Sequence, residues 1–161
     1  MDTAPATLLV AIPVYNHGRT LRDVVQRTLA VHPDVLVVDD GSTDGGADTL
    51  QGLPVRLLRH ERNLGKGQAI LTAAREAHRL GMTHLATIDS DGQHDPADLC
   101  AFLPLLRGEP EALVVGTRRF GADVPASSRY GRAFSNFWLR VQTGVRLGDT
   151  QSGFRVYPVA V

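Results

Sequence analysis

Short apolar runs alternate with helical patterns over roughly the first 116 residues of the chain. Runs of about four to eight apolar residues bounded by turn formers are typical of strands buried in a sheet. Runs of this kind predict strands at 7–12, 35–38, 55–58, 83–88 and 112–115. Apolar residues three or four positions apart predict helices between them, the first of which carries Leu21, Val24, Val25 and Leu29. Further helices are expected near 44–51, at 68–80 before Gly81, and at 97–103. This alternation predicts an α/β fold with a doubly wound, mostly parallel sheet and right-handed crossovers.

Polar clusters follow the carboxyl ends of four of these predicted strands, at Pro13–Asn16, Asp39–Asp44, Asp89–Asp95 and Gly116–Arg118. Because the carboxyl ends of parallel strands share one edge of a sheet, the clusters are expected to meet there. Open α/β sheets bind ligands in the crevice at that edge. The pattern therefore predicts a ligand site assembled from these turns.

The segment Asp89–Pro96 carries the most informative of these clusters. Asp89 and Asp91 are separated by one residue and directly follow a predicted strand. Such carboxylates suit Mg²⁺ or Mn²⁺, which proteins usually hold with one or two carboxylates plus substrate phosphates. Asp95 is a good N-cap, and Pro96 suits the first turn of the next helix. The alternative is an acidic turn that only caps this helix.

The alternating pattern ends after Arg119. Residues 120–128 read as a loop, and 129–144 predict a helix whose apolar stripe consists of Phe134, Phe137, Trp138 and Val141. This stripe either packs on the sheet or rests in a membrane interface with Arg132 and Arg140 near anionic headgroups. We expect no closing helix or strand before Val161, and we interpret the chain as truncated at its C-terminus.

The composition is that of an ordinary soluble globular protein. A chain of 161 residues, 43% hydrophobic and 21% charged, fits one domain with a sizeable core. The N-terminus lacks the layout of a targeting peptide, and no apolar run approaches the roughly 18 residues of a transmembrane helix. The single cysteine, Cys100, excludes an internal disulfide, fits a reducing cytoplasm and is expected to be a small core residue.

Charge is distributed unevenly, although the formal net charge is zero. Residues 1–117 hold ten Lys and Arg against fifteen Asp and Glu, whereas residues 118–161 hold seven Arg against Asp123 and Asp149. An acidic first part and an arginine-rich last part indicate a metal at one end of a site and phosphate near the other. Scattered, solvated surface charge is the alternative.

Missing motifs exclude several classes of nucleotide-binding protein. No Gly-x-Gly-x-x-Gly follows the first strand, which excludes a dinucleotide-binding domain. Lys66, the only lysine, is followed by Gly67 and not by Ser or Thr, so the P-loop is absent. Lys66 also comes too early for a phospho-acceptor signalling domain, which needs a lysine after the fifth strand. A sugar-phosphate nucleotidyltransferase would carry a glycine- and arginine-rich first loop, and this chain has none there.

Six motifs occur in a fixed order along the chain: Ile12–Asn16, Val38–Asp44, Asn63–Gly67, Asp89–His94, Gly116–Arg118 and Asp149–Arg155. In these motifs and their order the chain resembles the inverting GT-A glycosyltransferases of family two. Within that family it is most similar to the polyprenol-phosphate sugar synthases, such as dolichol-phosphate mannosyltransferase. The resemblance covers almost the whole chain and implies the Rossmann-like GT-A fold. It also implies a GDP- or UDP-linked sugar donor, Mg²⁺ or Mn²⁺ as cofactor, and no nucleic-acid partner.

The same resemblance implies roles for residues around the donor. Asp91 would hold the metal, assisted by Asp89 and Gln93, and Asp40 would accept hydrogen bonds from the base. The remaining expected donor-binding residues are Pro13, Tyr15, Asn16, Lys66 and Ser90. The structural alternatives are a turn-forming role for Asp40 and a core position for Tyr15.

An acceptor that carries a lipid phosphate is already anionic, so it needs positioning and not deprotonation by a general base. Arginine forks suit phosphate oxygens. Arg118, Arg129 and Arg132, with Ser135, are therefore the expected acceptor-phosphate site, although each arginine alone is equally consistent with a solvated surface residue. We count Arg118 with the two metal-site aspartates as catalytic.

The segment Gln151–Arg155 bears on the branch of the family. It departs from the Gln-x-x-Arg-Trp signature of other branches and resembles the Ser-Gly-Phe-Arg variant of the lipid-phosphate branch. This departure disfavours a processive polysaccharide synthase.

We therefore expect a metal-dependent inverting glycosyltransferase that moves a sugar from a nucleotide to a polyprenyl phosphate of the dolichyl or undecaprenyl type. It would work in the cytoplasm, peripherally at the cytoplasmic face of a membrane. One catalytic domain is expected over 1–161, with a nucleotide-sugar-binding part at about 1–118 and an incomplete acceptor-side part at about 119–161. The alternatives are a family-two enzyme acting on a saccharide or other hydroxyl acceptor in cell-envelope glycan synthesis, and a donor-binding fragment inactive without further sequence.

Overall fold

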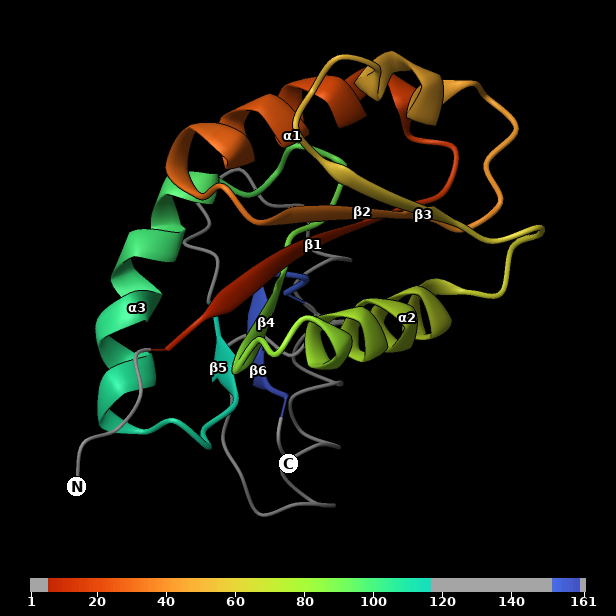
Figure 1. Cartoon of the computed structure of the whole chain (residues 1–161). Coiled ribbons are helices and arrows are strands. Elements are labelled where there is room, and N and C mark those ends of the chain that lie inside the picture. The colour runs from red at the N-terminus through yellow and green to blue at the C-terminus, as the bar shows by residue number, and fades with distance from the viewer. Residues whose placement is uncertain (1–5, 117–151, 160–161) are drawn as a thin grey trace, which may run out of the picture. The chain divides into compact units, whose positions relative to one another are not determined.

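The computed structural model describes residues 6–116 and 152–159 (Figure 1). Its strands are β1 (Leu8–Val14), β2 (Val35–Asp39), β3 (Arg56–Arg59), β4 (His84–Thr87), β5 (Val114–Val115) and β6 (Arg155–Pro158). Its helices are α1 (Gly18–Val31), α2 (Lys66–Arg79) and α3 (Leu99–Gly108), together with the 3₁₀ helices η1 (Gly46–Leu50) and η2 (Pro96–Asp98). The strands predicted from the apolar runs and the helices predicted between them are confirmed, with boundaries shifted by a few residues.

The strands form one sheet in the order β3-β2-β1-β4-β6-β5. β1 lies at its centre and pairs in parallel with β2 on one side and β4 on the other. β2 also pairs in parallel with β3. This arrangement confirms the mostly parallel α/β sheet and brings the carboxyl ends of β1, β2 and β4 to one edge.

β6 corrects the expectation that no further strand precedes the end of the chain. It pairs antiparallel with β4, with Thr87 opposite Arg155 and His84 opposite Pro158. The sequence signal is weak because Val156 is the only fully buried side chain of the strand and proline occupies its last position. The strand exists because it pairs with β4, a partner about 70 residues earlier that no local pattern reveals.

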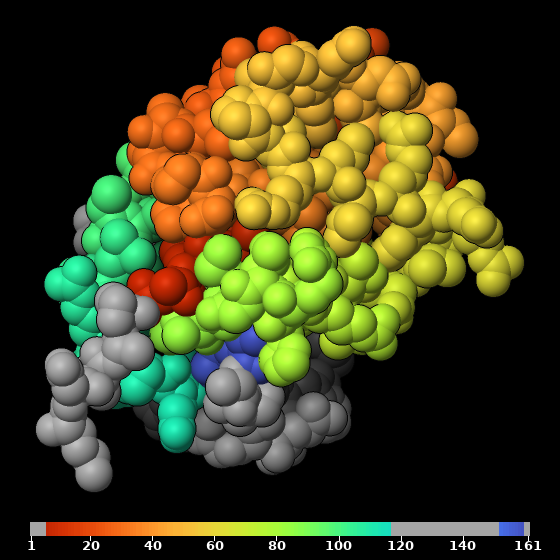
Figure 2. All heavy atoms as spheres, in the orientation of Figure 1, coloured from red at the N-terminus to blue at the C-terminus, as the bar shows by residue number. Residues whose placement is uncertain are grey.

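Alternate residues of β1 supply both faces of the core, as the two-residue period of a strand requires. Leu8, Val10 and Ile12 pack with residues of α1 and α3. Leu9 and Ala11 pack instead with a row of alanines, Ala69, Ala73 and Ala77, on α2. Figure 2 shows how little of β1, in red, remains visible between α1, in orange, and α2, in yellow-green. A strand buried on both faces explains why the run Leu8–Val14 is apolar without alternation.

The prediction that Cys100 is a core residue is wrong, because this side chain is exposed. α3 buries Leu99 and Leu106 and partly buries Phe102, so its core-facing stripe leaves position 100 on the other side. The predicted helix 97–103 begins as η2 and continues through Pro104 to Gly108.

Several expectations lie outside the described residues: the loop 120–128, the helix 129–144 and its apolar stripe. The division of the domain near residue 118 also stays a prediction. Among the described residues, no helix combines the length and apolarity needed to cross a membrane.

Candidate functional site

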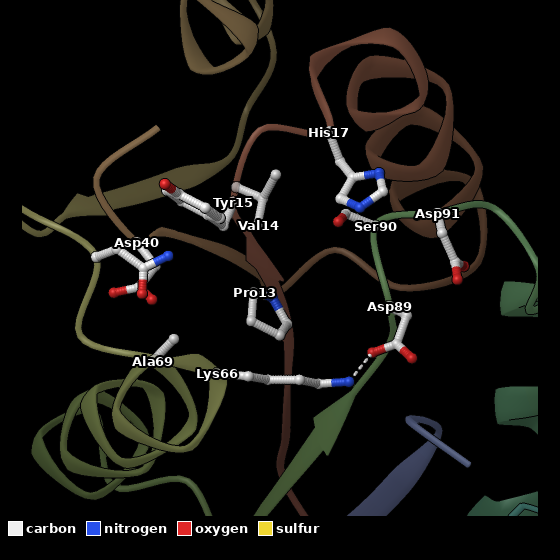
Figure 3. A pocket seen from close by; sticks show the side chains of 11 residues that line it. Pro13, Val14, Tyr15, His17, Asp40, Lys66, Ala69, Asp89, Ser90 and Asp91 are labelled. Atoms are coloured by element: carbon white, nitrogen blue, oxygen red, sulfur yellow. Dashed lines mark hydrogen bonds and ion pairs between the residues drawn. The ribbon is translucent and has the colours of Figure 1, made fainter. Parts of the chain in front are cut away.

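A cavity of about 340 Å³ opens at the edge where β1, β2 and β4 end. Its lining residues come from the β1 end and the following turn, from the β2 end, from the start of α2, and from the turn after β4 (Figure 3). They are Pro13, Val14, Tyr15, His17, Asp40, Asn63, Lys66, Ala69, Asp89, Ser90 and Asp91. The cavity brings together three of the four polar clusters that the strand pattern predicts at one edge.

Lys66 and Asp89 form an ion pair across the floor of this cavity (Figure 3). The Lys66 Nζ donates to Asp89 Oδ1 over 2.5 Å, from the first residue of α2 to the second residue after β4. The other oxygen, Asp89 Oδ2, lies 3.9 Å from the Nε2 of His94, which is buried. Asp89 is therefore held by Lys66 and lies near His94, while about half of the Lys66 side chain remains exposed to a ligand.

Asp91 lies in the turn that follows, with its carboxylate beside the cavity (Figure 3). Gly92 adopts a φ of 77°, a left-handed conformation that lets the chain turn back, so the Gln93 backbone N–H donates to Asp91 Oδ1 at 2.9 Å. The hydroxyl of Thr20 in α1 donates to the Ser90 carbonyl at 2.6 Å and anchors the turn. Asp95 accepts from the Ala97 backbone N–H, which confirms its predicted capping role.

The described residues include no group of three or more His, Cys, Asp or Glu side chains arranged to hold a metal ion. A site completed by a ligand's phosphates does not need three, since Mg²⁺ is commonly bound by one or two carboxylates and phosphate oxygens. Asp91, partly exposed and bonded within its own turn, fits this kind of site. The Gln93 side chain is exposed, and Gln93 does not line the cavity.

Asp40 lies on the opposite side of the cavity and is almost completely buried. Its Oδ1 accepts from the Leu64 backbone N–H at 2.9 Å and lies 2.7 Å from the Nδ1 of His60. Its Oδ2 accepts from the Gly65 backbone N–H at 2.8 Å. Burial by itself raises the pKa of this carboxyl, but the hydrogen bonds from His60, Leu64 and Gly65 outweigh it and lower the pKa below its ordinary value. Asp40 is thus a buried acceptor that stays ionised.

The residues after β1 divide between the cavity and the neighbouring loop. Pro13 and Tyr15 line the cavity, and Tyr15 is 45% exposed, so it is not a core residue. Asn16 does not line this cavity. With a φ of 53°, it accepts from the Thr43 backbone N–H and donates its own N–H to the Ser42 hydroxyl. In this structure Asn16 therefore joins the turns after β1 and β2.

Four lining residues were not predicted from the sequence: Val14, His17, Asn63 and Ala69. Asn63 belongs to the motif Asn63–Gly67, and His17 directly follows the motif that ends at Asn16. A place in or beside a motif was therefore the sequence feature that could have indicated these two residues as part of the site. Of the expected acceptor residues, Arg118, Arg129, Arg132 and Ser135 all lie outside the described residues.

The sequence model described as Glycosyl transferase family 2 matches residues 9–160. The chain belongs to glycosyl transferase family 2. The carboxylates at the ends of β2 and β4 that line the cavity are thus part of a glycosyltransferase domain.

Two relatives of this glycosyltransferase domain are named for lipid-phosphate acceptors. UDP-N-acetylglucosamine–dolichyl-phosphate N-acetylglucosaminyltransferase of Methanococcus voltae is 27% identical over 176 residues, which cover 96% of this chain and 70% of the relative. Undecaprenyl-phosphate mannosyltransferase of Micrococcus luteus is 30% identical over 161 residues, which cover 93% of this chain and 65% of the relative. The chain spans about two thirds of the length of these two relatives.

Among solved structures, glucosyl-3-phosphoglycerate synthase from Mycobacterium tuberculosis in complex with Mn²⁺ and uridine-diphosphate-glucose is similar, with a TM-score of 0.74 and 23% identity. The match covers 96% of this chain and 57% of that chain. Likeness at this identity concerns the fold, which is the GT-A fold expected from the motifs.

Proposed function

We propose that this domain transfers a sugar from a nucleotide-sugar donor to a polyprenyl phosphate, with inversion at the sugar carbon and with the help of Mg²⁺ or Mn²⁺. The observation that carries the donor part is the cavity at the sheet edge, where a buried anionic acceptor, Asp40, lies across from a lysine and two further carboxylates. Such a site matches a ligand with a base at one end and a charged diphosphate at the other.

The base is assigned to the Asp40 side of the cavity. An ionised carboxylate only accepts hydrogen bonds, so it pairs with a base edge that carries an N–H donor. Uracil and guanine present a ring N–H on their pairing edge. Cytosine and adenine present an amino N–H there, but the ring nitrogen beside it is an acceptor that a carboxylate would face unfavourably. This chemistry favours a UDP- or GDP-linked sugar.

The diphosphate is assigned to the side of Lys66, Asp89 and Asp91. Asp91, with Asp89 and Gln93 assisting, would hold the divalent cation, whose positive charge would stabilise the departing diphosphate as a leaving group. Lys66 is already aligned by Asp89 and is half exposed, so its ammonium is available to a phosphate oxygen. Support for a metal comes from the donor set and from the similar fold solved with Mn²⁺ and uridine-diphosphate-glucose.

The acceptor is assigned by chemistry and by the names of relatives, among them the enzymes of Methanococcus voltae and Micrococcus luteus. A phosphate oxygen of the lipid would attack the anomeric carbon as the bond from that carbon to the nucleoside diphosphate breaks. Because the attacking oxygen is already anionic, the protein needs to position it and offset its charge. We assign this role to Arg118, Arg129, Arg132 and Ser135, and the lipid acceptor would bring the enzyme to the cytoplasmic face of a membrane.

A transfer assay tests this proposal. Purified protein would be incubated with labelled UDP- and GDP-sugars, with undecaprenyl or dolichyl phosphate in detergent, and with Mn²⁺, Mg²⁺ or a chelator. We expect label to move into the lipid fraction with one nucleotide class, and only when a divalent ion is present. Transfer to a saccharide instead of the lipid would overturn the acceptor assignment, and binding of none of the nucleotide sugars would overturn the function itself.

A further inference from the structure

His60 is a mostly buried imidazole between Asp40 and α2, and none of the roles above uses it. The parallel register of β2 and β3 places Asp39 opposite Arg59, so the next residues along, Asp40 and His60, leave the sheet side by side. The His60 backbone N–H also donates to the Asp39 carbonyl at 2.8 Å, which continues the strand pairing by one step. The position of His60 against Asp40 is therefore fixed by the sheet and not by a flexible loop.

Both ring nitrogens of His60 have partners. Nδ1 lies 2.7 Å from Asp40 Oδ1, and Nε2 lies 2.9 Å from the hydroxyl of Thr72 in α2. An ionised carboxylate can only accept, so the proton between His60 and Asp40 belongs to Nδ1. The imidazole side chain is only 12% exposed, so rotation of the ring would leave buried polar atoms without partners.

The contacts to Asp40 come from three directions: His60 after β3, and the backbone N–H groups of Leu64 and Gly65 before α2. Together they use three of the roughly four acceptor sites of a carboxylate. One acceptor site of the carboxylate therefore remains for a hydrogen bond from a ligand, and a ligand can reach it because Asp40 lines the cavity. The orientation of that last acceptor direction depends on the groups that hold the other three.

We propose that His60, braced by Thr72, is a positioning residue that sets the direction in which Asp40 accepts a hydrogen bond and thereby sets the selectivity for the donor base. This inference rests on the proposed nucleotide-sugar donor. Asp40 would touch the base, whereas His60 would act only through Asp40. Loss of the His60 contact should therefore reduce discrimination between bases more than it reduces binding of the diphosphate.

Two substitutions of similar polarity distinguish the contribution of the Nδ1 contact from that of the Nε2 contact of His60. In His60→Asn the side-chain amide nitrogen takes the approximate place of Nδ1 and can still donate a hydrogen bond to Asp40. In His60→Gln the longer side chain places its amide nitrogen near Thr72, so the hydrogen bond to Asp40 is lost. His32→Asn is the control, because His32 is likewise a hydrogen-bonded histidine, with Nε2 2.7 Å from the Leu8 carbonyl, but it does not line the cavity.

The measurement is calorimetric titration of UDP, GDP, CDP and ADP, in the presence of Mg²⁺, into the whole chain. We expect wild type to prefer UDP or GDP, and His60→Gln to weaken the preferred nucleotide about tenfold while changing CDP and ADP little. His60→Asn and His32→Asn should keep the wild-type preference within about twofold. In an Asp40→Ala background, His60→Gln should have no further effect.

An unchanged ratio of dissociation constants in His60→Gln, or equal losses in His60→Gln and His60→Asn, would overturn the positioning role while leaving the donor site intact. Wild-type protein that binds none of the four nucleotides would overturn the proposed function, and this inference with it. If both His60 variants fail to fold, Thr72→Val provides the test with a smaller change. It removes only the hydroxyl partner of Nε2 and should weaken the preferred nucleotide selectively by a few-fold, and an unchanged preference would count against the proposal.

Discussion

Single residues around the cavity differ in how much of their hydrogen-bonding capacity the protein itself uses. Asp40 has three donors, and Asp89 has Lys66 on one oxygen and His94 near the other. Asp91, by contrast, accepts one bond from the backbone of its own turn within the described part of the chain. This difference in remaining capacity makes Asp91 the carboxylate best suited to take a ligand, and Asp40 the one most strongly oriented.

The lowered pKa of Asp40 predicts how stability depends on pH. The hydrogen bonds favour the ionised form in the folded protein, so the folded pKa lies below the ordinary value of 3.8. The stabilisation is fully present above the unfolded pKa and is lost as the pH falls through the lower, folded pKa. Asp40→Asn should therefore be less stable than wild type by about 1–3 kcal/mol near neutral pH.

Urea denaturation monitored by circular dichroism from pH 7 down to pH 3 would test this prediction. The difference between wild type and Asp40→Asn should stay constant to about pH 4 and shrink below it. A matched substitution at an exposed carboxylate, Asp98→Asn, should show no such trend. A difference that grows as the pH falls would contradict the expected sign.

A residue of this site could be predicted from the sequence when the pattern that indicates its position lies in the neighbouring residues. Asp89 and Asp91 follow an apolar run directly, so position in the sequence alone places them at the sheet edge. The environment of Asp40 was not predictable, because His60 and Leu64 reach it only through the pairing of β2 with β3 and the position of α2, where Thr72 contacts His60. Tertiary contacts of this kind leave no periodic trace in the sequence.

At the scale of secondary-structure elements, the start of α1 packs against the start of η1 through two glycines, Gly18 and Gly46. A Cβ on Gly46 would lie 2.4 Å from the Cα of Gly18, and a Cβ on Gly18 would lie 2.6 Å from the Cα of Gly46. Asp44 fixes this contact by accepting from both backbone N–H groups, at 2.8 Å from Gly18 and 3.0 Å from Gly46. The turns after β1 and β2 are thus packed backbone to backbone.

Gly46→Ala should therefore force the two turns apart and destabilise the fold by about 1–3 kcal/mol. Gly67→Ala is the control, since a Cβ there meets nothing within 4 Å and the residue lies inside α2. This control should be neutral or stabilising by up to about 1 kcal/mol. Chemical denaturation of both variants gives the comparison, and equal stability of the two would show that the glycine contact is not required.

Elements with a continuous apolar run were predicted well, and elements that depend on a distant partner were not. β1, β2 and β4 are buried throughout, so their composition alone identifies them. β6 has one fully buried side chain and was missed. β3 is mostly exposed at the edge of the sheet, yet the leucines between its two arginines were enough to predict a strand there.

At the scale of the whole molecule, the arginine-rich segment after residue 117 is expected to meet the lipid acceptor. The predicted helix 129–144 would place Trp138 at a membrane interface, with Arg132 and Arg140 near anionic headgroups. Trp138 is the only tryptophan, so its fluorescence reports on this segment alone.

We expect the emission of Trp138 to shift to the blue when vesicles containing phosphatidylglycerol are added, and the double variant Arg132→Ala with Arg140→Ala to weaken that shift. Vesicles of phosphatidylcholine alone are the control for charge and should give a smaller response. Emission that is already blue-shifted in buffer and indifferent to either vesicle would place Trp138 in the protein core and remove the membrane helix from this account.

The central claim is that the cavity at the ends of β1, β2 and β4 binds a nucleoside diphosphate through a divalent ion held by Asp91. Calorimetric titration of UDP and GDP, each with Mn²⁺ and with a chelator, into wild type, Asp91→Asn and the control Asp98→Asn tests it most directly. We expect Mn²⁺ to tighten binding of one nucleotide to wild type and Asp98→Asn by about tenfold or more, a difference of about 1.4 kcal/mol, and to have little effect in Asp91→Asn. If a folded Asp91→Asn binds that nucleotide with the same dependence on Mn²⁺ as wild type, Asp91 does not hold the metal and the account of this site is wrong.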